Sequence, residues 1–475
     1  MNCVRRIAKN IFVLSSSEIT VKVLQVFLLI FIARILREVE FGKYTFTIAF
    51  STIAIIFADI GMQTLLIREM SRNRKIVNKY IVNASILKLF LSIIAFCIVV
   101  VSLNILNYSV GIRLIVYIFY LSFILKSFIE LFSSVFLASE KMEWAAFIKI
   151  SRAFILTSLV VLALLKGMDL IAVASIYLMT EVILLILALV ILFKKFIRLK
   201  FEFDFSFIKK LLKQSIPFAL TAVFYNIYYY IDSVMLSKIK GNYEVGIYGA
   251  AYSIPVALIL IPAIYTSAIF PVISRFYITS KESLIYAYER SLKYIATIAF
   301  PVSMILFLSS YNIMHFLYGP GYHVSGFILK ILAIVIVFRF ISYLNGVVLA
   351  SVNRQKERVI FQGITACINI ILNLILIPSF SFVGAAIATI ISEFILLIFY
   401  MTLIFRYVTN MKSLLIILKP FIATIIISPI LFIDISAFIT IPSAIILYSA
   451  FILIFKVFDK EDIRLLKKIL NKNRS

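Results

Sequence analysis

The sequence predicts an all-α integral membrane protein with about fourteen transmembrane helices. Of its 475 residues, 63% are hydrophobic, whereas soluble domains contain about 45–50%. The mean hydropathy is +1.10, and apolar stretches follow one another with only short polar connections. These observations leave no room for a sizeable soluble domain.

Each predicted helix is an apolar stretch near the length of about 20 residues that spans a bilayer. Their approximate bounds are 11–33, 44–67, 80–106, 114–138, 145–165, 170–193, 211–236, 245–274, 294–316, 324–350, 359–378, 382–405, 414–433 and 437–455. The N-terminal segment resembles the start of a signal peptide, but no convincing cleavage site follows it. We therefore expect an uncleaved first helix.

Basic residues in the connections predict the orientation. With the N-terminus placed in the cytoplasm, the inner segments carry 34 Lys and Arg residues and the outer loops carry 7. Cytoplasmic loops carry such an excess, so both termini are predicted to be cytoplasmic in a plasma membrane. This asymmetry and attraction to anionic lipids explain most of the net charge of +25, and no nucleic-acid partner is expected.

An internal repeat divides the predicted chain. The loop "ARILREVEFGKY" (33–44) and the loop "SKIKGNYEVGIY" (237–248) both end in Gly-x-Tyr, 204 residues apart. An offset of six helices predicts parallel repeats. We expect an N-terminal lobe at 1–200, a C-terminal lobe at 201–408, and two trailing helices with a basic cytoplasmic tail at 409–475.

Charged residues inside the predicted spans are the candidate functional residues, because a charge at the bilayer centre costs about 2.5–3.5 kcal/mol on insertion scales. Such residues must pair, face a wet cavity, or both. The candidates for a polar substrate cavity are Glu18, Lys22, Asp59, Lys126, Glu130, Arg152, Asp232, Lys330 and Arg339. Lys88 lies near a span end, where its side chain could reach the interface.

Two of these charge pairs are spaced by one helical turn. Glu18 with Lys22, and Lys126 with Glu130, are predicted to meet on one helix face. Two interpretations remain open: the members of each pair neutralise each other, or both pairs line a polar cavity. Glu181 and Glu393 lie near the middle of corresponding helices, where packing and cavity roles are equally compatible with the sequence.

The chain lacks the sequence features that are typical of several other classes of membrane protein. The chain has no G-x-x-x-x-G-K-[ST] motif to hold ATP, no D-x-D pair at a loop and no large outer loop for a glycosyl acceptor. Its three cysteines are widely separated, and His315 and His323 flank a short loop. We therefore expect a secondary transporter rather than an enzyme, with no cofactor and no metal site.

The chain resembles the polysaccharide transporter (Wzx-like) flippases of the multidrug/oligosaccharidyl-lipid/polysaccharide superfamily. The similarity lies in "ARILREVEFGKY", "FADIGMQTLLIREMSR", "YYYIDSVMLSKIKGNYEVGIYGAAYSI", "YGPGYH", "LASVNRQKE" and "NIILNLILIPSFSFVGAAIATIISE". Glu38 and Ser233 depart from the family pattern. Because Ser233 stands where the family often has Arg, Asp232 is expected to be less tightly paired.

The resemblance implies two six-helix lobes around a central cavity, and movement of a polyprenyl diphosphate-linked oligosaccharide from the cytoplasmic to the outer leaflet by alternating access. The expected partners are this glycolipid and membrane lipids, and the use of a coupling ion, H⁺ or Na⁺, is left open. Basic residues can bind the diphosphate. Glu18 is expected to compensate the charge of Lys22 while no cargo is bound, which lowers the cost of that charge in the membrane. The alternative is a cation-coupled multidrug or metabolite exporter of the same superfamily, in which acidic residues would bind the cargo.

Overall fold

The computed structural model describes residues 2–197, 200–429, 437–455 and 457–458, and within these residues it contains helices and no strands. The expected basic tail falls almost wholly on residues outside this set. The chain forms two compact units: unit 1 contains residues 1–250 and 370–385, and unit 2 contains residues 251–369 and 386–475. The lobe boundaries at residues 200 and 408 rest on the sequence repeat and remain a prediction.

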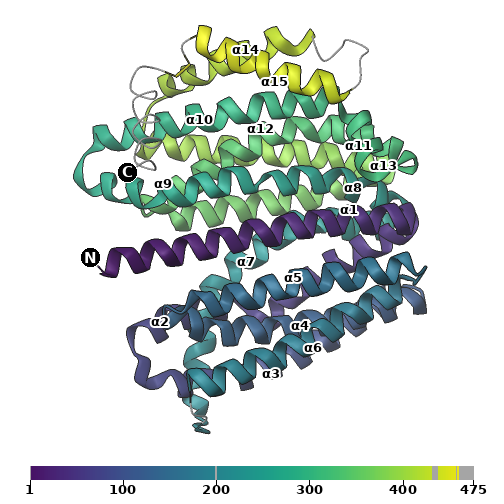
Figure 1. Cartoon of the computed structure of the whole chain (residues 1–475), viewed down its shortest axis with the longest axis vertical. Coiled ribbons are helices and arrows are strands. Elements are labelled where there is room, and N and C mark those ends of the chain that lie inside the picture. The colour runs from purple at the N-terminus through teal and green to yellow at the C-terminus, as the bar shows by residue number, and fades with distance from the viewer. Residues whose placement is uncertain (1, 198–199, 430–436, 456, 459–475) are drawn as a thin grey trace. The chain divides into compact units, whose positions relative to one another are not determined.

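Unit 1 is built from long helices that lie side by side (Figure 1). They are α1 (Asn2–Asp59), α2 (Met62–Arg72), α3 (Val77–Ile105), α4 (Val110–Ala138), α5 (Met142–Leu165), α6 (Leu170–Lys195), α7 (Phe205–Ile239), the first part of α8 (Asn242–Leu258) and residues 370–385 of α13 (Gln355–Tyr407), with the 3-10 helix η1 (Arg74–Ile76). α1 packs against α3, α4, α5 and α7, and α4 packs against α6.

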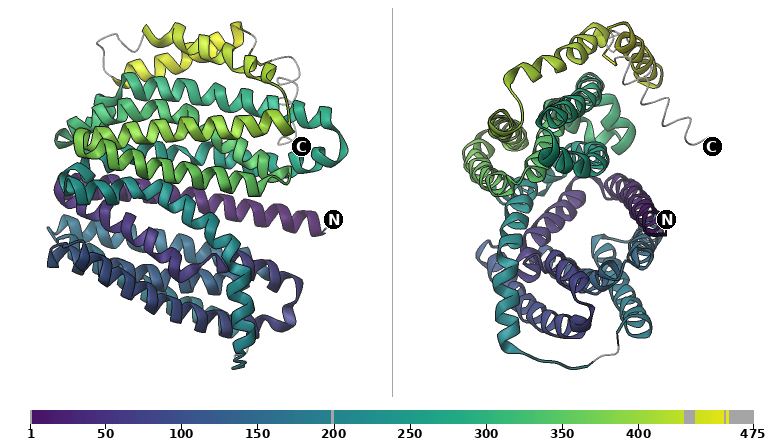
Figure 2. Two further views of the ribbon diagram at one scale, coloured as in Figure 1. Left: turned by 180° about the vertical axis from the view of Figure 1, so that it is seen from behind. Right: turned by 90° about the vertical axis from the view of Figure 1, so that its left-hand side faces the viewer.

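A break at Arg37 divides α1 into two helices. Its backbone has φ 60° and ψ −176°, which no α-helix accommodates. In Figure 2 the purple chain crosses unit 1 from the N-terminus and then turns back. The membrane-length part of α1 has 44 residues, about twice the length that spans a bilayer. The break therefore provides the two antiparallel crossings that the sequence predicts, with a shorter connection than expected.

Carboxylate caps fix where α6 and α7 begin. Asp169 accepts a hydrogen bond from the Ala172 amide, and Asp204 accepts one from the Phe207 amide. Asp204 also pairs with Lys79 at 2.6 Å. The hydrogen bond from Lys79, followed by those from Ser206 and the Phe207 amide, holds the pKa of the Asp204 carboxyl below its ordinary value. The cap therefore stays ionised at neutral pH, where a carboxylate at a helix N-terminus is favourable.

The two Gly-x-Tyr segments of the sequence repeat contact each other reciprocally in unit 1. A Cβ at Gly42 would lie 1.7 Å from the Asn242 carbonyl oxygen, and a Cβ at Gly246 would lie 2.0 Å from the Glu38 carbonyl oxygen. Each contact is the other shifted by 204 residues, as expected for a local two-fold relation. Only glycine allows backbones to approach so closely, which explains why both copies carry it.

Unit 2 is also a bundle of side-by-side helices (Figure 2). It contains the remainder of α8, α9 (Leu260–Thr279), α10 (Lys281–Leu308), α11 (Ser310–Tyr318), α12 (His323–Ser351), most of α13 (Gln355–Tyr407), α14 (Leu418–Ile427) and α15 (Ala437–Ile454), with the 3-10 helices η2 (Pro320–Tyr322) and η3 (Met411–Ile417). α10 packs against α9, α12 and α14, and α14 packs against α15.

Nine helical stretches within the described residues are long and apolar enough to cross a membrane. Two of them contain a break: α1 at Arg37, and α13 at Ser381, where φ is 52°. The break in α13 falls between the two spans predicted at 359–378 and 382–405. These observations confirm an all-α membrane protein, while the total of fourteen crossings stays a prediction.

Alanine at either glycine of the reciprocal contact is expected to destabilise the protein. Gly42→Ala and Gly246→Ala each drive a methyl group into a backbone carbonyl, so the helices must separate, at a cost of about 1–3 kcal/mol. Gly111→Ala in α4 is the control, because nothing lies within 4 Å of its added Cβ. Thermal unfolding in detergent measures the difference. Equal midpoints for all three variants would contradict the close contact.

Candidate functional site

Charged side chains gather on three neighbouring helices of unit 1, and we call this group the charged cluster. α1, α4 and α5 supply its members and pack against one another. The members are Glu18, Lys22, Lys126, Glu130, Lys149 and Arg152. Four of the six are basic. Five were predicted from the sequence, and Lys149 was not among the candidates, although it lies inside the predicted span at 145–165 and inside α5.

Glu18 does not pair with Lys22, so the interpretation that these two residues neutralise each other is wrong. The Oε1 atom of Glu18 lies 2.5 Å from Nζ of Lys149, so the ion pair joins α1 to α5. Lys22 is exposed, and among the described residues it has no hydrogen-bond or ion-pair partner. The reason is geometric: α5 packs along α1 and brings a second cation to Glu18. One lysine of the charged cluster thus remains available to an anion.

The predicted pair on α4 is present. Nζ of Lys126 lies 3.6 Å from Oε1 of Glu130, and both side chains are about 40% exposed. Arg152 on α5 is close enough to Glu130 to interact with it electrostatically. Pairs this open are worth about 0–1 kcal/mol, so they can break when a stronger partner arrives.

Arg152 connects the charged cluster to the interior of unit 1. Its Nε donates to Oε1 of Glu181 on α6 at 2.5 Å, and Glu181 is fully buried. Tyr177 lies one turn before Glu181 on α6, and its hydroxyl is 3.0 Å from that of Tyr44. Glu181 was placed near mid-span by the sequence, but its partner on another helix could not be inferred from spacing.

Asp59 is paired with a lysine that is not a member of the charged cluster. Its carboxylate accepts a hydrogen bond from Nζ of Lys88, which also donates to the Ser127 carbonyl oxygen at 2.7 Å. Lys88 is 1% exposed. The expectation that Lys88 reaches the interface is therefore wrong, because the C-terminal end of α1 and the backbone of α4 surround its ammonium group. This pair ties α1, α3 and α4 together.

Asp232 on α7 is buried and well supported by hydrogen bonds. Its two oxygens accept hydrogen bonds from the Tyr248 hydroxyl at 2.8 Å and from Nδ2 of Asn373 at 2.7 Å. Ser233 was expected to leave Asp232 less tightly paired, and this expectation is wrong. Neutral donors from α8 and α13 hold the carboxylate where arginine is frequent in the family that the sequence resembles.

Unit 2 holds a second arginine–glutamate pair. Nε of Arg339 on α12 donates to Oε1 of Glu393 on α13 at 2.6 Å, and its Nη2 donates to the Tyr252 hydroxyl at 3.3 Å. Both charged side chains are at most 3% exposed. Lys330 lies two to three turns earlier on α12, with Nζ 5.0 Å from the centre of the Phe307 ring. These two candidates are not brought together with the charged cluster inside one unit.

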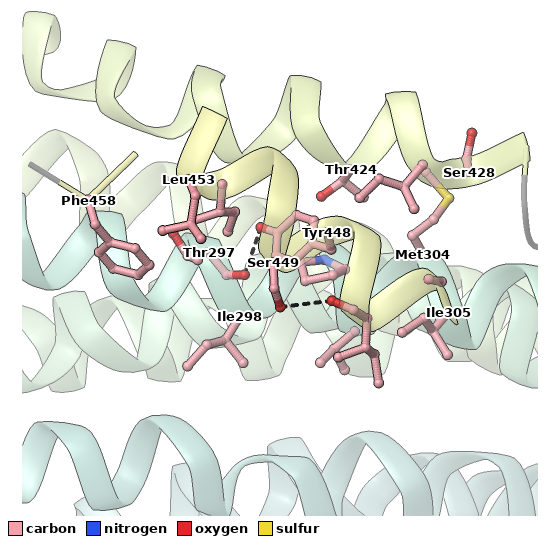
Figure 3. A pocket seen from close by; sticks show the side chains of 16 residues that line it. Thr297, Ile298, Met304, Ile305, Thr424, Ser428, Tyr448, Ser449, Leu453 and Phe458 are labelled. Carbon is pink, nitrogen blue, oxygen red and sulfur yellow. Dashed lines mark hydrogen bonds between the residues drawn. The ribbon is translucent and has the colours of Figure 1, made fainter. Parts of the chain in front are cut away.

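A large pocket in unit 2 has a different character. It has a volume of about 590 Å³ and lies between α10, α14 and α15 (Figure 3). Its walls are mainly aliphatic, and no charged side chain lines it. Tyr448 donates its hydroxyl hydrogen to the Thr297 carbonyl oxygen at 2.8 Å, which satisfies the main polar group on the wall. The pocket suits an apolar chain and offers nothing to an anion.

The charged cluster is the arrangement with the clearest chemical capacity. It presents exposed cations beside weakly held carboxylates on helices of membrane-spanning length. Among the described residues, no group of three or more His, Cys, Asp or Glu side chains could hold a metal ion. A polar ligand with negative charge fits such a surface, since lysine and arginine form strong hydrogen bonds with phosphate oxygens.

Two family profiles match the chain. That of the family described as "Polysaccharide biosynthesis protein" matches residues 7–277, and that of the family described as "MatE" matches residues 217–375. The probable flippase AglR of Haloferax volcanii is 30% identical over 169 residues, which are 35% of this chain and 35% of AglR. The chain thus matches little more than a third of AglR's own length. An uncharacterized membrane protein of Methanocaldococcus jannaschii, MJ1068, is 23% identical over 76% of both chains.

Solved structures share the fold. A lipid II flippase, MurJ, in an inward closed conformation has a TM-score of 0.77 at 18% identity, covering 93% of this chain and 98% of its own. An inward-facing multidrug resistance MATE transporter of the MOP superfamily has a TM-score of 0.65 at 15% identity, covering 82% and 95%. At these identities the likeness establishes the architecture of the chain.

The two clearest basic candidates should differ in what their loss does to stability. Arg339→Gln leaves the buried Glu393 carboxylate without its charged partner and is expected to cost about 3–5 kcal/mol. Lys22→Gln alters an exposed side chain and should stay within about 0.5 kcal/mol. Thermal unfolding of both variants in detergent provides the comparison. An Arg339→Gln protein as stable as Lys22→Gln would show that the buried pair is not structural.

Proposed function

We propose that this chain, which belongs to the polysaccharide biosynthesis protein family, is a flippase that moves lipid-linked oligosaccharide across a membrane. The cargo would be an oligosaccharide on a polyprenyl diphosphate. The charged cluster of unit 1 is the observation that carries this proposal. The names of AglR and MurJ, both flippases, are consistent with it.

The cost of charge in hydrocarbon supports a wet surface at the charged cluster. Each charge facing lipid near the bilayer centre would cost about 2.5–3.5 kcal/mol. α1 presents two adjacent exposed stripes: Glu18, Lys22 and Gln25 are polar, whereas Ile19, Val23 and Phe27 are apolar. A helix with this pattern places one stripe against water and the other against lipid.

The diphosphate of such a cargo suits the basic side of the charged cluster. Lys22 and Lys126 provide compact charges, and Arg152 provides a planar fork for phosphoryl oxygens. Water in the same space would keep the sugars solvated. The prenyl chain needs only an apolar surface, which the surrounding lipid supplies.

The direction of transport follows from the predicted topology. The excess of Lys and Arg on the inner segments, 34 against 7, supports cytoplasmic termini and insertion in the plasma membrane. The cargo would enter from the cytoplasmic leaflet and leave to the outer leaflet. The repeat-based lobes at 1–200 and 201–408 would rock about their shared axis to give alternating access. No chemical conversion of the cargo is part of this cycle.

A coupling ion, H⁺ or Na⁺, would need a buried carboxylate. Asp232 is the candidate, because it is 2% exposed and accepts hydrogen bonds from a phenol and an amide. The alternative function, a cation-coupled exporter of drugs or metabolites, draws on the same carboxylates and on the MatE match at residues 217–375. The excess of basic over acidic residues in the charged cluster favours the anionic glycolipid.

Translocation by Lys22→Gln protein tests the proposal. In vesicles loaded with a polyprenyl diphosphate that carries a labelled sugar, wild type is expected to move the label to the opposite leaflet. Loss of one charge-assisted hydrogen bond, about 1.5–3 kcal/mol, should slow Lys22→Gln about tenfold or more. Lys166→Gln is the control, because Lys166 is an exposed residue in the turn after α5.

Three outcomes would refute parts of this account. Unchanged glycolipid movement in Lys22→Gln would remove the charged cluster from the path. An equal loss in Lys166→Gln would indicate a general effect of surface charge. Transport of ethidium by wild type, without glycolipid movement, would establish the exporter alternative.

A further inference from the structure

Glu181 is a buried carboxylate beneath the charged cluster that the proposed function does not use. It is fully buried on α6, and its Oε1 atom accepts the hydrogen bond from Nε of Arg152. Its Oε2 atom is buried and has no hydrogen-bond partner among the described residues. A carboxylate is costly in such surroundings unless its charge is compensated. Glu181 therefore holds Arg152 in place through the Nε atom of its guanidinium group.

Arg152 has a second edge that is open. A guanidinium carries five N–H donors in a rigid plane, and the bond to Glu181 uses the one on Nε. Within the described part of the chain, no hydrogen bond or ion pair involves the Nη atoms of Arg152, and the side chain is 17% exposed. Arg152 also interacts electrostatically with Glu130, a member of the charged cluster, so its remaining donors are available beside that cluster.

The pair in unit 2 shows that this arrangement is not a general property of buried arginines. Arg339 uses Nε for Glu393 in the same way, at 2.6 Å. Its Nη2 atom, however, donates to Tyr252, and the side chain is only 3% exposed. In the Arg339–Glu393 pair, a tyrosine inside the protein occupies a further guanidinium donor. In the Arg152–Glu181 pair, the guanidinium is more exposed and its Nη donors have no partner within the described residues.

We propose that Glu181 is a positioning residue that fixes Arg152 so that the Nη edge of its guanidinium binds the phosphoryl oxygens of an anionic ligand at the charged cluster. An arginine held in place loses little entropy when it binds, and its two Nη groups match two phosphate oxygens. Lys126 lies close enough to Glu181 to interact with it and adds a second cation to the same site. Identification of the ligand as the diphosphate of the cargo rests on the proposed function.

Pyrophosphate binding tests this role without transport. Calorimetry on purified protein in neutral detergent should show binding by wild type. Glu181→Leu frees the guanidinium and is expected to weaken binding about tenfold. Arg152→Lys keeps the charge but loses the fork and should weaken binding at least as much. Glu181→Gln retains an acceptor for Nε and should fall between wild type and Glu181→Leu.

The sign of the change separates positioning from plain electrostatics. Removal of a negative charge near the site would strengthen anion binding if charge alone mattered. Tighter binding by Glu181→Gln, or by Glu181→Leu, would therefore overturn the proposal. Glu393→Leu is the matched control: it breaks the closed pair of unit 2 and should leave pyrophosphate affinity within twofold. An equal loss of pyrophosphate affinity in Glu393→Leu would show that the effect of the Glu181 variants is general destabilisation of the protein.

Lipid composition distinguishes the two sources of phosphate. Affinity should be the same in nanodiscs of neutral lipid and in nanodiscs containing phosphatidylglycerol. A large loss of pyrophosphate binding in the anionic nanodiscs would assign the site to lipid headgroups and overturn the diphosphate assignment. If the variants follow the expected order but wild type moves no glycolipid in vesicles, the positioning role stands and the proposed function fails.

Discussion

The cost of placing a charge in hydrocarbon governs how this chain is arranged. Insertion scales put that cost at about 2.5–3.5 kcal/mol for each charge near the bilayer centre. The structure avoids this cost in two ways. Some charges form ion pairs within the protein, as in the pairs Lys88–Asp59 and Arg339–Glu393. The charged cluster instead keeps its charges exposed and loosely paired, which is tolerable only beside water. The second solution is the one that leaves donors free for a ligand.

Arg152 combines these two arrangements, because it is paired with a buried carboxylate and is also a member of the charged cluster. Its Nε atom belongs to a pair with the buried Glu181, and its Nη donors have no hydrogen-bond partner within the described residues. A ligand that binds there does not have to break the buried pair, so the stability of unit 1 and the chemistry of the site are separated. The close packing of Gly42 and Gly246 serves a different need, because it joins the two copies of the sequence repeat through their backbones.

The sequence was sufficient for the membrane class and for the breaks near Arg37 and Ser381, which fall between predicted spans, because hydropathy is a local property. It was not sufficient for every helix end, since the predicted span at 44–67 is interrupted at Ile60 and Gly61, where α1 gives way to α2. Pairing within one helix was also predictable, as Lys126 with Glu130 shows. Pairing between helices was not. Glu18 lies one turn from Lys22 but contacts Lys149, and Lys88 is buried rather than interfacial. Spacing along a helix cannot reveal which neighbour brings a competing charge, and only the packing of α1 on α5 settles that choice.

Cysteine accessibility on α1 tests most directly whether the charged cluster faces water. In a cysteine-free background, Lys22→Cys lies on the polar stripe and Val23→Cys on the apolar stripe, and both native side chains are exposed in the structure. With a hydrophilic thiol reagent in membranes, Lys22→Cys is expected to label and Val23→Cys to stay unlabelled, and the glycolipid should protect Lys22→Cys. Equal labelling of both positions, or of neither, would contradict a wet transport path along the charged cluster.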